Sequence, residues 1–250
     1  MKNKILAVLS FISIIGGGQQ LFAEPKDRGS QVLITAGEFV MGDTYCADEQ
    51  SNSDWCSDEV PHKVRLDAYR IDIHEVTNSD YQECFSAGEC GPNALHEDRP
   101  QEFNRPGQPV VFVTWEDANS YCQWKGGRLP FEAEWERAAQ GENPGGAYFG
   151  KKYKQGAPQK VGERAPNSNG LYDMMGNVNE WVWDWYGEPE TEGVSANPKG
   201  PASGKDKVVR GGSWNSPSHY LRASDRVFRS PELRYSDVGF RCVTPSSEKG

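Results

Sequence analysis

Six cysteines constrain this chain of 250 residues more than any other feature of its sequence. Their number is even, and an even set of cysteines in an exported chain is typical of a disulfide framework. Six cysteines can pair in many ways, so spacing is the guide to the pairs. The spacing favours two local bridges and leaves one long bridge: Cys46 with Cys56, Cys84 with Cys90, and Cys122 with Cys242.

Residues 1–23 have the pattern of a cleaved secretory signal peptide. Two early lysines give a positive start, an apolar run at 5–15 is too short to span a bilayer, and Ala23 ends the segment with a small residue. Leu21 stands where a cleavage site prefers a small residue, so an uncleaved anchor is the alternative. We expect residues 24–250 to form one secreted or periplasmic domain without a transmembrane helix.

The expected location decides between two interpretations of the cysteines. An oxidising compartment favours disulfides, whereas a metal or redox site needs clustered ligands. No Cys-x-x-Cys motif occurs, and the four histidines are spread along the chain at positions 62, 74, 96 and 219. Three disulfides are therefore the prediction.

The composition predicts a loop-rich core rather than a bundle of helices. The chain holds 27 Gly, 16 Pro and 8 Trp, while only 36% of its residues are hydrophobic. A chain of this length can bury a sizeable core, and no repeat or interior linker divides it, so we expect a single domain. The formal net charge of -9 and the lack of a densely basic window argue against nucleic acid as a partner.

Local patterns predict short strands. The strand-like segments 31–35 and 38–41 are separated by Ala36-Gly37, which is a hairpin signal, and residues 64–73 alternate as one half-buried strand would. Alternation also places Trp181, Trp183 and Trp185 on one face, for which core packing is the simplest role. The other predicted strands are 181–185, 207–210 and 239–243.

Capping chemistry predicts three helices. Thr77 with Asp80 and Thr114 with Asp117 have the spacing of a capping box, in which two side chains bond the free amides at a helix start. A third helix is expected at 132–140. Regular helical periodicity is absent after residue 141.

A series of short motifs, in order along nearly the whole mature chain, resembles the formylglycine-generating enzyme or sulfatase-modifying-factor family. The resemblance implies an α+β fold of the C-type-lectin-like type with little regular secondary structure, and it also implies a bridge between Cys122 and Cys242. The motifs include Gly37-Glu-Phe-x-Met-Gly42, Glu75-Val-Thr-Asn78, Trp115-x-Asp-Ala118, Arg128-Leu-Pro130, Glu132-Ala-Glu-Trp-Glu136, Asn169-Gly-Leu-Tyr-Asp173, Glu180-Trp181, Arg210-Gly-Gly-Ser-Trp214 and Gly239-Phe-Arg241.

The sequence departs from this family where the copper chemistry resides. The family's copper-dependent oxidases carry two cysteines shortly after the Gly-Gly-Ser-aromatic motif, and these thiolates bind Cu(I), a soft metal that prefers sulfur. Here the two positions hold Ser216 and Leu221. Copper is therefore not an expected cofactor, and we expect the family's signature oxidation to be absent.

The same segment supplies the candidate pocket that the resemblance indicates. His219 and Arg222 invite a catalytic interpretation, but a lone histidine without a paired acid is more often a surface or packing residue. In some relatives this segment is hypervariable and presents a receptor surface. The candidate pocket residues are Trp214, Asn215, Ser216, His219, Tyr220, Leu221 and Arg222.

One calcium site of the family is retained in the sequence. The resemblance assigns side-chain ligands to Asp173 and Glu180 and carbonyl ligands to Gly176 and Val178. Calcium takes six to eight hard oxygen ligands in irregular geometry, which two carboxylates, turn carbonyls and water can supply. The alternative is a solvated acidic turn. We expect one structural calcium ion.

Three functions remain open from the sequence. The first is an accessory or binding role in the cell envelope, with a protein, peptide or small molecule as ligand. The second is a periplasmic oxidative tailoring enzyme that works without the cysteine pair. The third is a formylglycine-generating oxidase that acts on sulfatase cysteines. The missing thiols and the predicted export favour the first two.

Overall fold

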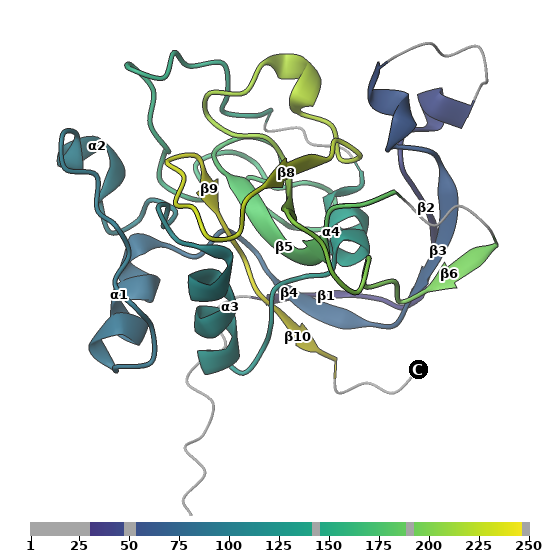
Figure 1. The fold of residues 1–250 in the computed structure, drawn as a ribbon, viewed down its shortest axis with the longest axis horizontal. Coiled ribbons are helices and arrows are strands. Elements are labelled where there is room, and N and C mark those ends of the chain that lie inside the picture. Colours follow the sequence, from purple (N-terminus) through teal and green to yellow (C-terminus); the bar gives the residue numbers. More distant parts are fainter. Residues whose placement is uncertain (1–30, 48–53, 142–145, 189–192, 247–250) are drawn as a thin grey trace, which may run out of the picture.

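The computed structural model describes residues 31–47, 54–141, 146–188 and 193–246, and the predicted signal peptide lies outside them. Within these ranges, three small sheets and four short α-helices form the regular structure, and long loops connect them (Figure 1). No helix in the described part of the chain is long and apolar enough to cross a membrane. The predicted loop-rich α+β architecture is confirmed.

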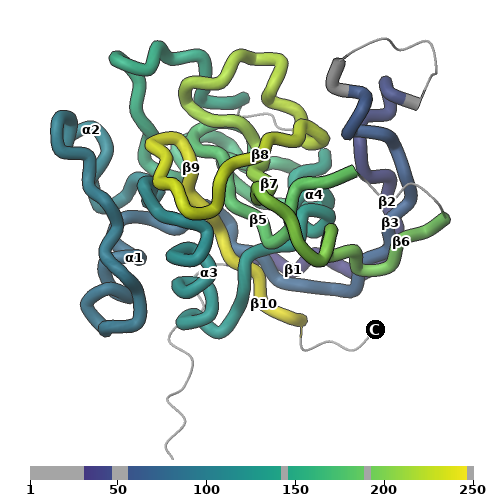
Figure 2. Tube along the Cα trace, in the orientation of Figure 1, coloured from purple at the N-terminus to yellow at the C-terminus, as the bar shows by residue number. Residues whose placement is uncertain are grey.

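The sheets bring distant parts of the chain together, because strand neighbours are rarely neighbours in sequence (Figure 2). The first sheet has the order β1 (Gln31–Ile34), β4 (Tyr69–Asp72) and β10 (Val243–Pro245). The second has the order β2 (Gly37–Met41), β3 (His62–Leu66) and β6 (Val194–Ala196). The third has the order β8 (Val227–Arg229), β7 (Lys207–Arg210), β5 (Asn179–Trp185) and β9 (Val238–Gly239).

The hairpin predicted at Ala36-Gly37 is wrong. β1 pairs with β4 and β2 pairs with β3, so the two segments belong to different sheets. The single strand predicted at 64–73 is likewise divided into β3 and β4, and the one at 239–243 into β9 and β10. Alternation of apolar and polar residues indicates that a segment forms a strand. The strand with which it pairs depends on contacts made elsewhere in the fold.

The predicted helix starts are confirmed. Thr77 Oγ1 accepts a hydrogen bond from the Asp80 amide at 3.2 Å, and the Asp80 carboxylate accepts one from the Thr77 amide at 3.1 Å, which begins α1 (Asn78–Ser86). Thr114 and Asp117 begin α3 (Trp115–Trp124) in the same way. The remaining helices are α2 (Pro100–Phe103), α4 (Glu132–Ala139) and the 3-10 turns Thr44–Ala47, Asp54–Ser57 and Ser218–Tyr220.

The core is aromatic and tied by disulfides, as the composition and cysteine spacing predict. Trp135, Trp181 and Trp214 are fully buried. All six cysteines are paired, in the bridges Cys46–Cys56, Cys84–Cys90 and Cys122–Cys242. The last bridge joins α3 to the residue before β10, so it connects the middle of the chain to its end.

Only one of the three alternating tryptophans belongs to the core. Trp181 is fully buried, but Trp183 and Trp185 are half-buried. The Lys207 ammonium lies 4.0 Å from the ring centre of Trp115 and 3.9 Å from that of Trp185. These tryptophans therefore enclose a lysine by cation–π contact rather than fill an apolar core.

The long bridge should matter most for stability. Replacement of Cys122 and Cys242 by Ala opens a loop of 120 residues, whereas the same change at Cys84 and Cys90 opens one of 6. The chain-entropy model gives a loss of about 5 kcal/mol for the long loop and about 2 kcal/mol for the short one. Urea unfolding of both variants under non-reducing conditions measures the difference, and equal losses would contradict this account.

Candidate functional site

The side chains at the two positions that the resemblance assigns to copper ligands both lie close to Gly212. Gly211 and Gly212 follow β7 with φ angles of 93° and 68°. A β-carbon on Gly212 would lie 2.7 Å from Leu221 Cδ2 and 3.6 Å from Ser216 Cβ, so both side chains pack against the same stretch of backbone. The fold brings the pair together, but a hydroxyl and an isobutyl group present no sulfur to a Cu(I) ion.

The Ser216 side chain has a structural role in this turn. Its Oγ accepts a hydrogen bond from the Ser213 amide at 2.9 Å, and Ser213 Oγ donates to Asn215 Oδ1 at 2.6 Å. These bonds satisfy polar groups of the turn locally. Ser216 and Asn215 thus stabilise the loop that carries them.

Trp214 is buried in the core and anchors the turn at residues 211–216. It is fully buried, its ring centre lies 5.9 Å from that of Phe103 and 6.0 Å from that of Tyr153, and its Nε1 donates to the Ser236 carbonyl at 3.3 Å. The glycines and Trp214 together fix the loop in place. Trp214 is therefore a packing residue and is not exposed to a ligand.

The other predicted pocket residues point in two directions. His219 and Tyr220 are exposed, and their rings lie 4.3 Å apart. Arg222 instead contacts acidic side chains: its Nη1 donates to Asp43 at 2.9 Å and to Glu59 at 2.5 Å. The structure groups Ser216 with Leu221 but does not place all seven predicted residues around one ligand position.

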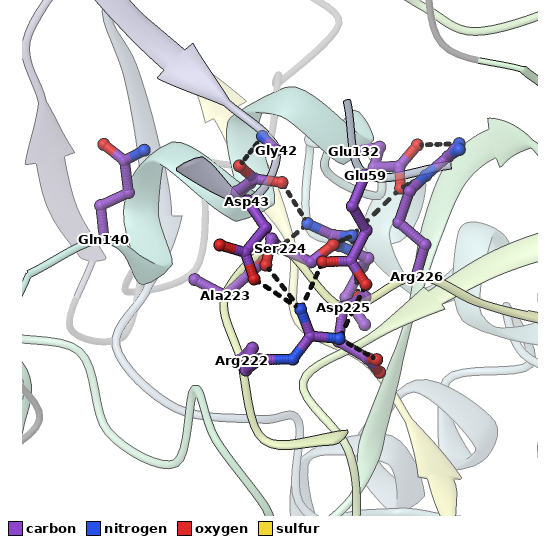
Figure 3. Close-up of polar contacts among 12 residues, drawn as sticks. Gly42, Asp43, Glu59, Glu132, Gln140, Arg222, Ala223, Ser224, Asp225 and Arg226 are labelled. Carbon is purple, nitrogen blue, oxygen red and sulfur yellow. Dashed lines mark hydrogen bonds and ion pairs between the residues drawn. The ribbon is translucent and has the colours of Figure 1, made fainter. Parts of the chain in front are cut away.

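A buried network of three arginines holds this segment to the rest of the domain (Figure 3). We call it the arginine network. Arg210 is fully buried, pairs with Glu136 at 2.5 Å and with Glu132 at 3.3 Å, and donates to the carbonyls of residues 223–225. Its members are Arg210, Arg222 and Arg226 with the acids Asp43, Glu59, Glu132, Glu136 and Asp225.

Burial and the neighbouring arginines shift the pKa values of the acids of the arginine network in opposite directions. Burial, and next the charge of Glu59, raise the pKa of Asp225 to about 7, while the nearby arginines lower it. Sequence reasoning did not identify this network, although its main residues lie in two of the motifs quoted above. The signal available was the presence of charged residues, Glu132, Glu136 and Arg210, inside otherwise apolar motifs.

The predicted calcium ligands lie around a second buried arginine. Arg241 donates from Nη2 to Glu180 Oε1 and from Nε to Glu180 Oε2, both at 2.7 Å, and Trp135 Nε1 donates to Oε2 at 2.8 Å. Asp173 Oδ2 accepts from the Gly162 amide at 2.7 Å. Glu180 is therefore largely occupied by protein donors.

Glu75 is the acid of this region with an open acceptor. It is fully buried, its Oε1 accepts from Asn177 at 3.0 Å, and its Oε2 has no partner among the described residues. Burial, and next the charge of Asp173, raise its pKa. Glu75, Asp173 and Glu180 all interact electrostatically with the guanidinium of Arg241, so negative charge exceeds positive charge in this region.

A calcium ion at this position would depend on the backbone as well. Within the described residues, no group of three or more His, Cys, Asp or Glu side chains is placed to hold a metal ion. Asp173, Gly176 and Asn177 adopt positive φ angles, so the turn between them is irregular. The carbonyls of Gly176 and Val178, which the resemblance assigned as ligands, belong to this turn.

The fold and this site define a disulfide-tied, C-type-lectin-like α+β domain whose glycine turn lacks the paired thiols of a copper centre. The chain belongs to the family of the sulfatase-modifying factor enzyme 1-like domain, whose model matches residues 19–245.

Relatives with curated names cover most of the chain. The formylglycine-generating enzyme of Bos taurus is 30% identical, over 88% of this chain and 75% of the relative. The inactive C-alpha-formylglycine-generating enzyme 2 of Mus musculus is 35% identical, over 86% and 85%. The serine/threonine-protein kinase pkn1 of Chlamydia pneumoniae is 38% identical over 88% of this chain, which spans only 39% of that protein.

Solved structures support the same fold. Treponema denticola variable protein 1 is 28% identical, with a TM-score of 0.70 over 86% of this chain and 95% of that chain. PvdO from Pseudomonas aeruginosa is 24% identical, with a TM-score of 0.71 over 86% and 94%, which bears on the fold alone.

The segment 214–234 should tolerate substitution of its exposed side chains but not of the buried Trp214. Tyr220 and Leu233 are 42% and 56% exposed, so replacement of both by Ser should leave the melting temperature nearly unchanged. Replacement of Trp214 by Ala should lower the free energy of unfolding by about 3–5 kcal/mol, because the ring is fully buried. Thermal and urea unfolding monitored by circular dichroism test both, and a large loss in the double variant would contradict the surface assignment.

Proposed function

We propose that this protein is an exported binding domain that keeps the family scaffold without the family's copper oxidase chemistry. The main support for the proposal is the pair Ser216 and Leu221. Both side chains lie close to Gly212, and they occupy the positions where the resemblance places two copper-binding cysteines. The six cysteines of the chain are all in disulfides, so none of them remains to bind copper.

Export is supported by the cysteines and by the start of the sequence. Three disulfides persist in an oxidising compartment, and residues 1–23 have the pattern of a signal peptide. Both features support a secreted or periplasmic location. An accessory role in the cell envelope is compatible with such a location.

The binding surface that we propose is the exposed part of the segment after Trp214. Residues 217–220 and 232–234 are exposed, while the backbone between them is held by the arginine network. A rigid base with variable exposed side chains suits recognition by loops. Two relatives support this proposal by name: one is called inactive, and the other is called a variable protein.

The enzyme alternatives have less support. A formylglycine-generating oxidase is suggested by the relative from Bos taurus, but this chain lacks both thiols at the expected positions. An oxidative tailoring enzyme independent of those thiols would need another redox site. Among the described residues, the four histidines form no cluster with acids or cysteines that could hold a metal ion.

The absence of copper chemistry can be tested directly. The mature protein, incubated with Cu(I), oxygen and a peptide containing Cys-x-Pro-x-Arg, should leave the mass and thiol content of the peptide unchanged, because no protein thiol is available to bind the metal. Mass spectrometry of the peptide provides the measurement. Formation of an aldehyde product would overturn the proposal.

A gain-of-function variant provides the matched control. Because Ser216 and Leu221 lie against the same glycine, replacement of both by Cys should create a Cu(I) site, while the single replacements should bind much more weakly. Competition with a chromogenic Cu(I) chelator measures the affinities. Binding by the natural protein as tight as that of the double variant would contradict our account of the site.

We further propose one structural calcium ion near Asp173, Glu75 and the Gly176–Val178 turn. The unpartnered Glu75 oxygen and the excess of buried carboxylates support it. Such an ion would balance buried charge and stabilise the loop-rich core, and no chemical step depends on it.

Removal of calcium should destabilise the protein. Saturating calcium should raise the melting temperature by about 5–10 °C over that in chelator. Replacement of Glu75 by Gln should reduce this difference, because it removes a buried charge and leaves the hydrogen bonds between Arg241 and Glu180 in place. Replacement of Glu180 by Gln should abolish the difference but also weaken the pair with Arg241, so it should lower the melting temperature in both conditions. Equal melting of the natural protein with and without chelator would exclude the ion.

A further inference from the structure

A cavity of about 300 Å3 lies beside α4, and its lining includes neither Ser216 nor Leu221. It is enclosed by the start of α4, the segment 58–62 that leads into β3, and the loop 198–201 that follows β6. Apolar groups form part of its wall, and the exposed side chains of Glu188 and Lys199 belong to its lining. Cavities of this size hold small ligands or single side chains.

Asp184 on β5 is an acid of the cavity wall that forms no ion pair with an arginine of the described residues. Its side chain is buried, with 4% of the residue exposed, and it lines the cavity. Oδ2 accepts a hydrogen bond from the Glu132 amide at 2.8 Å. Oδ1 accepts no hydrogen bond and contacts no cation within the described residues. Because Oδ1 has no protein donor and Asp184 lines the cavity, a ligand in the cavity can donate a hydrogen bond to this oxygen.

The loop over Asp184 approaches this oxygen closely. Gly200 has a φ of 68°, and a β-carbon there would lie 2.8 Å from Asp184 Oδ1. Only glycine therefore fits beside the carboxylate. Burial, and next the charge of Glu132, raise the pKa of Asp184 to about 8, while the hydrogen bond from the Glu132 amide and the charge of Lys207 lower it.

The other buried acids of the cavity wall each have a cationic partner. Glu59 is bound by Arg222 and Glu132 by Arg226, as Figure 3 shows. Glu136 is bound by Arg210. These pairs account for the arginines of the network and leave none for Asp184. The nearest lysine on the adjacent strand, Lys207, donates to the Trp183 carbonyl at 2.6 Å and is held between tryptophan rings.

The chemistry of the cavity distinguishes between kinds of cation. A metal ion needs several oxygen or nitrogen ligands around it, and the acids Glu132 and Glu136 on the same wall are already bound by arginines. An organic cation needs only one acceptor for its N–H group and an apolar wall for its carbon chain. Met41, Val60 and Ala133 supply such a wall.

We propose that this cavity binds an organic cation, an ammonium or guanidinium group on a short carbon chain, whose N–H group donates to Asp184 Oδ1. The site is separate from the exposed loop that we propose as a binding surface, and neither proposal depends on the other. A free amine and the side chain of a lysine or arginine in a peptide share this chemistry.

The test is a calorimetric titration of the full mature chain with four probes at constant ionic strength: n-butylammonium chloride, ethylguanidinium chloride, n-butanol and calcium chloride. At least one organic cation should bind saturably at one site, and n-butanol should bind at least about tenfold more weakly. Lysine-containing and arginine-containing tripeptides then distinguish a free amine from a peptide side chain.

Replacement of Asp184 by Asn should weaken binding at least about tenfold, because the amide keeps an acceptor for the Glu132 amide but removes the charge. Replacement of Glu38 by Gln, at an exposed position of β2 outside the cavity, is the matched control and should leave the affinity unchanged. Equal binding by the Asp184 variant, or binding of calcium alone at this site, would overturn the proposal.

A spectroscopic readout on the natural protein covers the case in which the Asp184 variant does not fold. Titration with the organic cation should shift the backbone amide resonances of Glu132, Ser195 and Gly200, which surround the cavity. Shifts confined to other parts of the domain, or no saturable shift with either cation, would also overturn the proposal.

Discussion

The buried guanidinium of Arg210 is the interaction on which the rest of this structure depends. It joins α4 to β7 through Glu132 and Glu136, and it binds three successive carbonyls of the segment that follows the glycine turn. Loss of one partner from a buried ion pair is strongly destabilising, because a charge is left without compensation. A segment with little regular structure is thereby held at one position.

Chemistry and scaffold are separate in this domain. The glycine turn, the buried Trp214 and the arginine network hold the segment in which the resemblance places two thiols, yet Ser216 and Leu221 occupy the two positions. A framework that needs no sulfur to fold can lose its metal site and remain stable. This separation explains how one family contains both formylglycine-generating enzymes and a relative named as inactive.

Some of the buried acids form an ion pair with an arginine, and others have a carboxylate oxygen without a protein partner. Glu59, Glu132, Glu136 and Glu180 are each matched to an arginine, and their pairs connect distant segments. Glu75 and Asp184 are not matched in this way, and both lie at positions where we propose a cation. An unmatched buried carboxylate oxygen is costly, so the open acceptor of Glu75 is informative about ligands.

The sequence by itself determined the features that depend on local chemistry: the helix starts at Thr77 and Thr114, the aromatic core, the disulfide pairs and the missing thiols. The motifs also indicated the family and its loop-rich fold. Tertiary structure alone decided which strands pair, why β1 and β2 belong to different sheets, and how Arg222 and Asp184 are used. The physical reason is that a cap or a local disulfide joins residues close in sequence, whereas strand partners, buried ion pairs and cavities depend on residues brought together from across the whole chain.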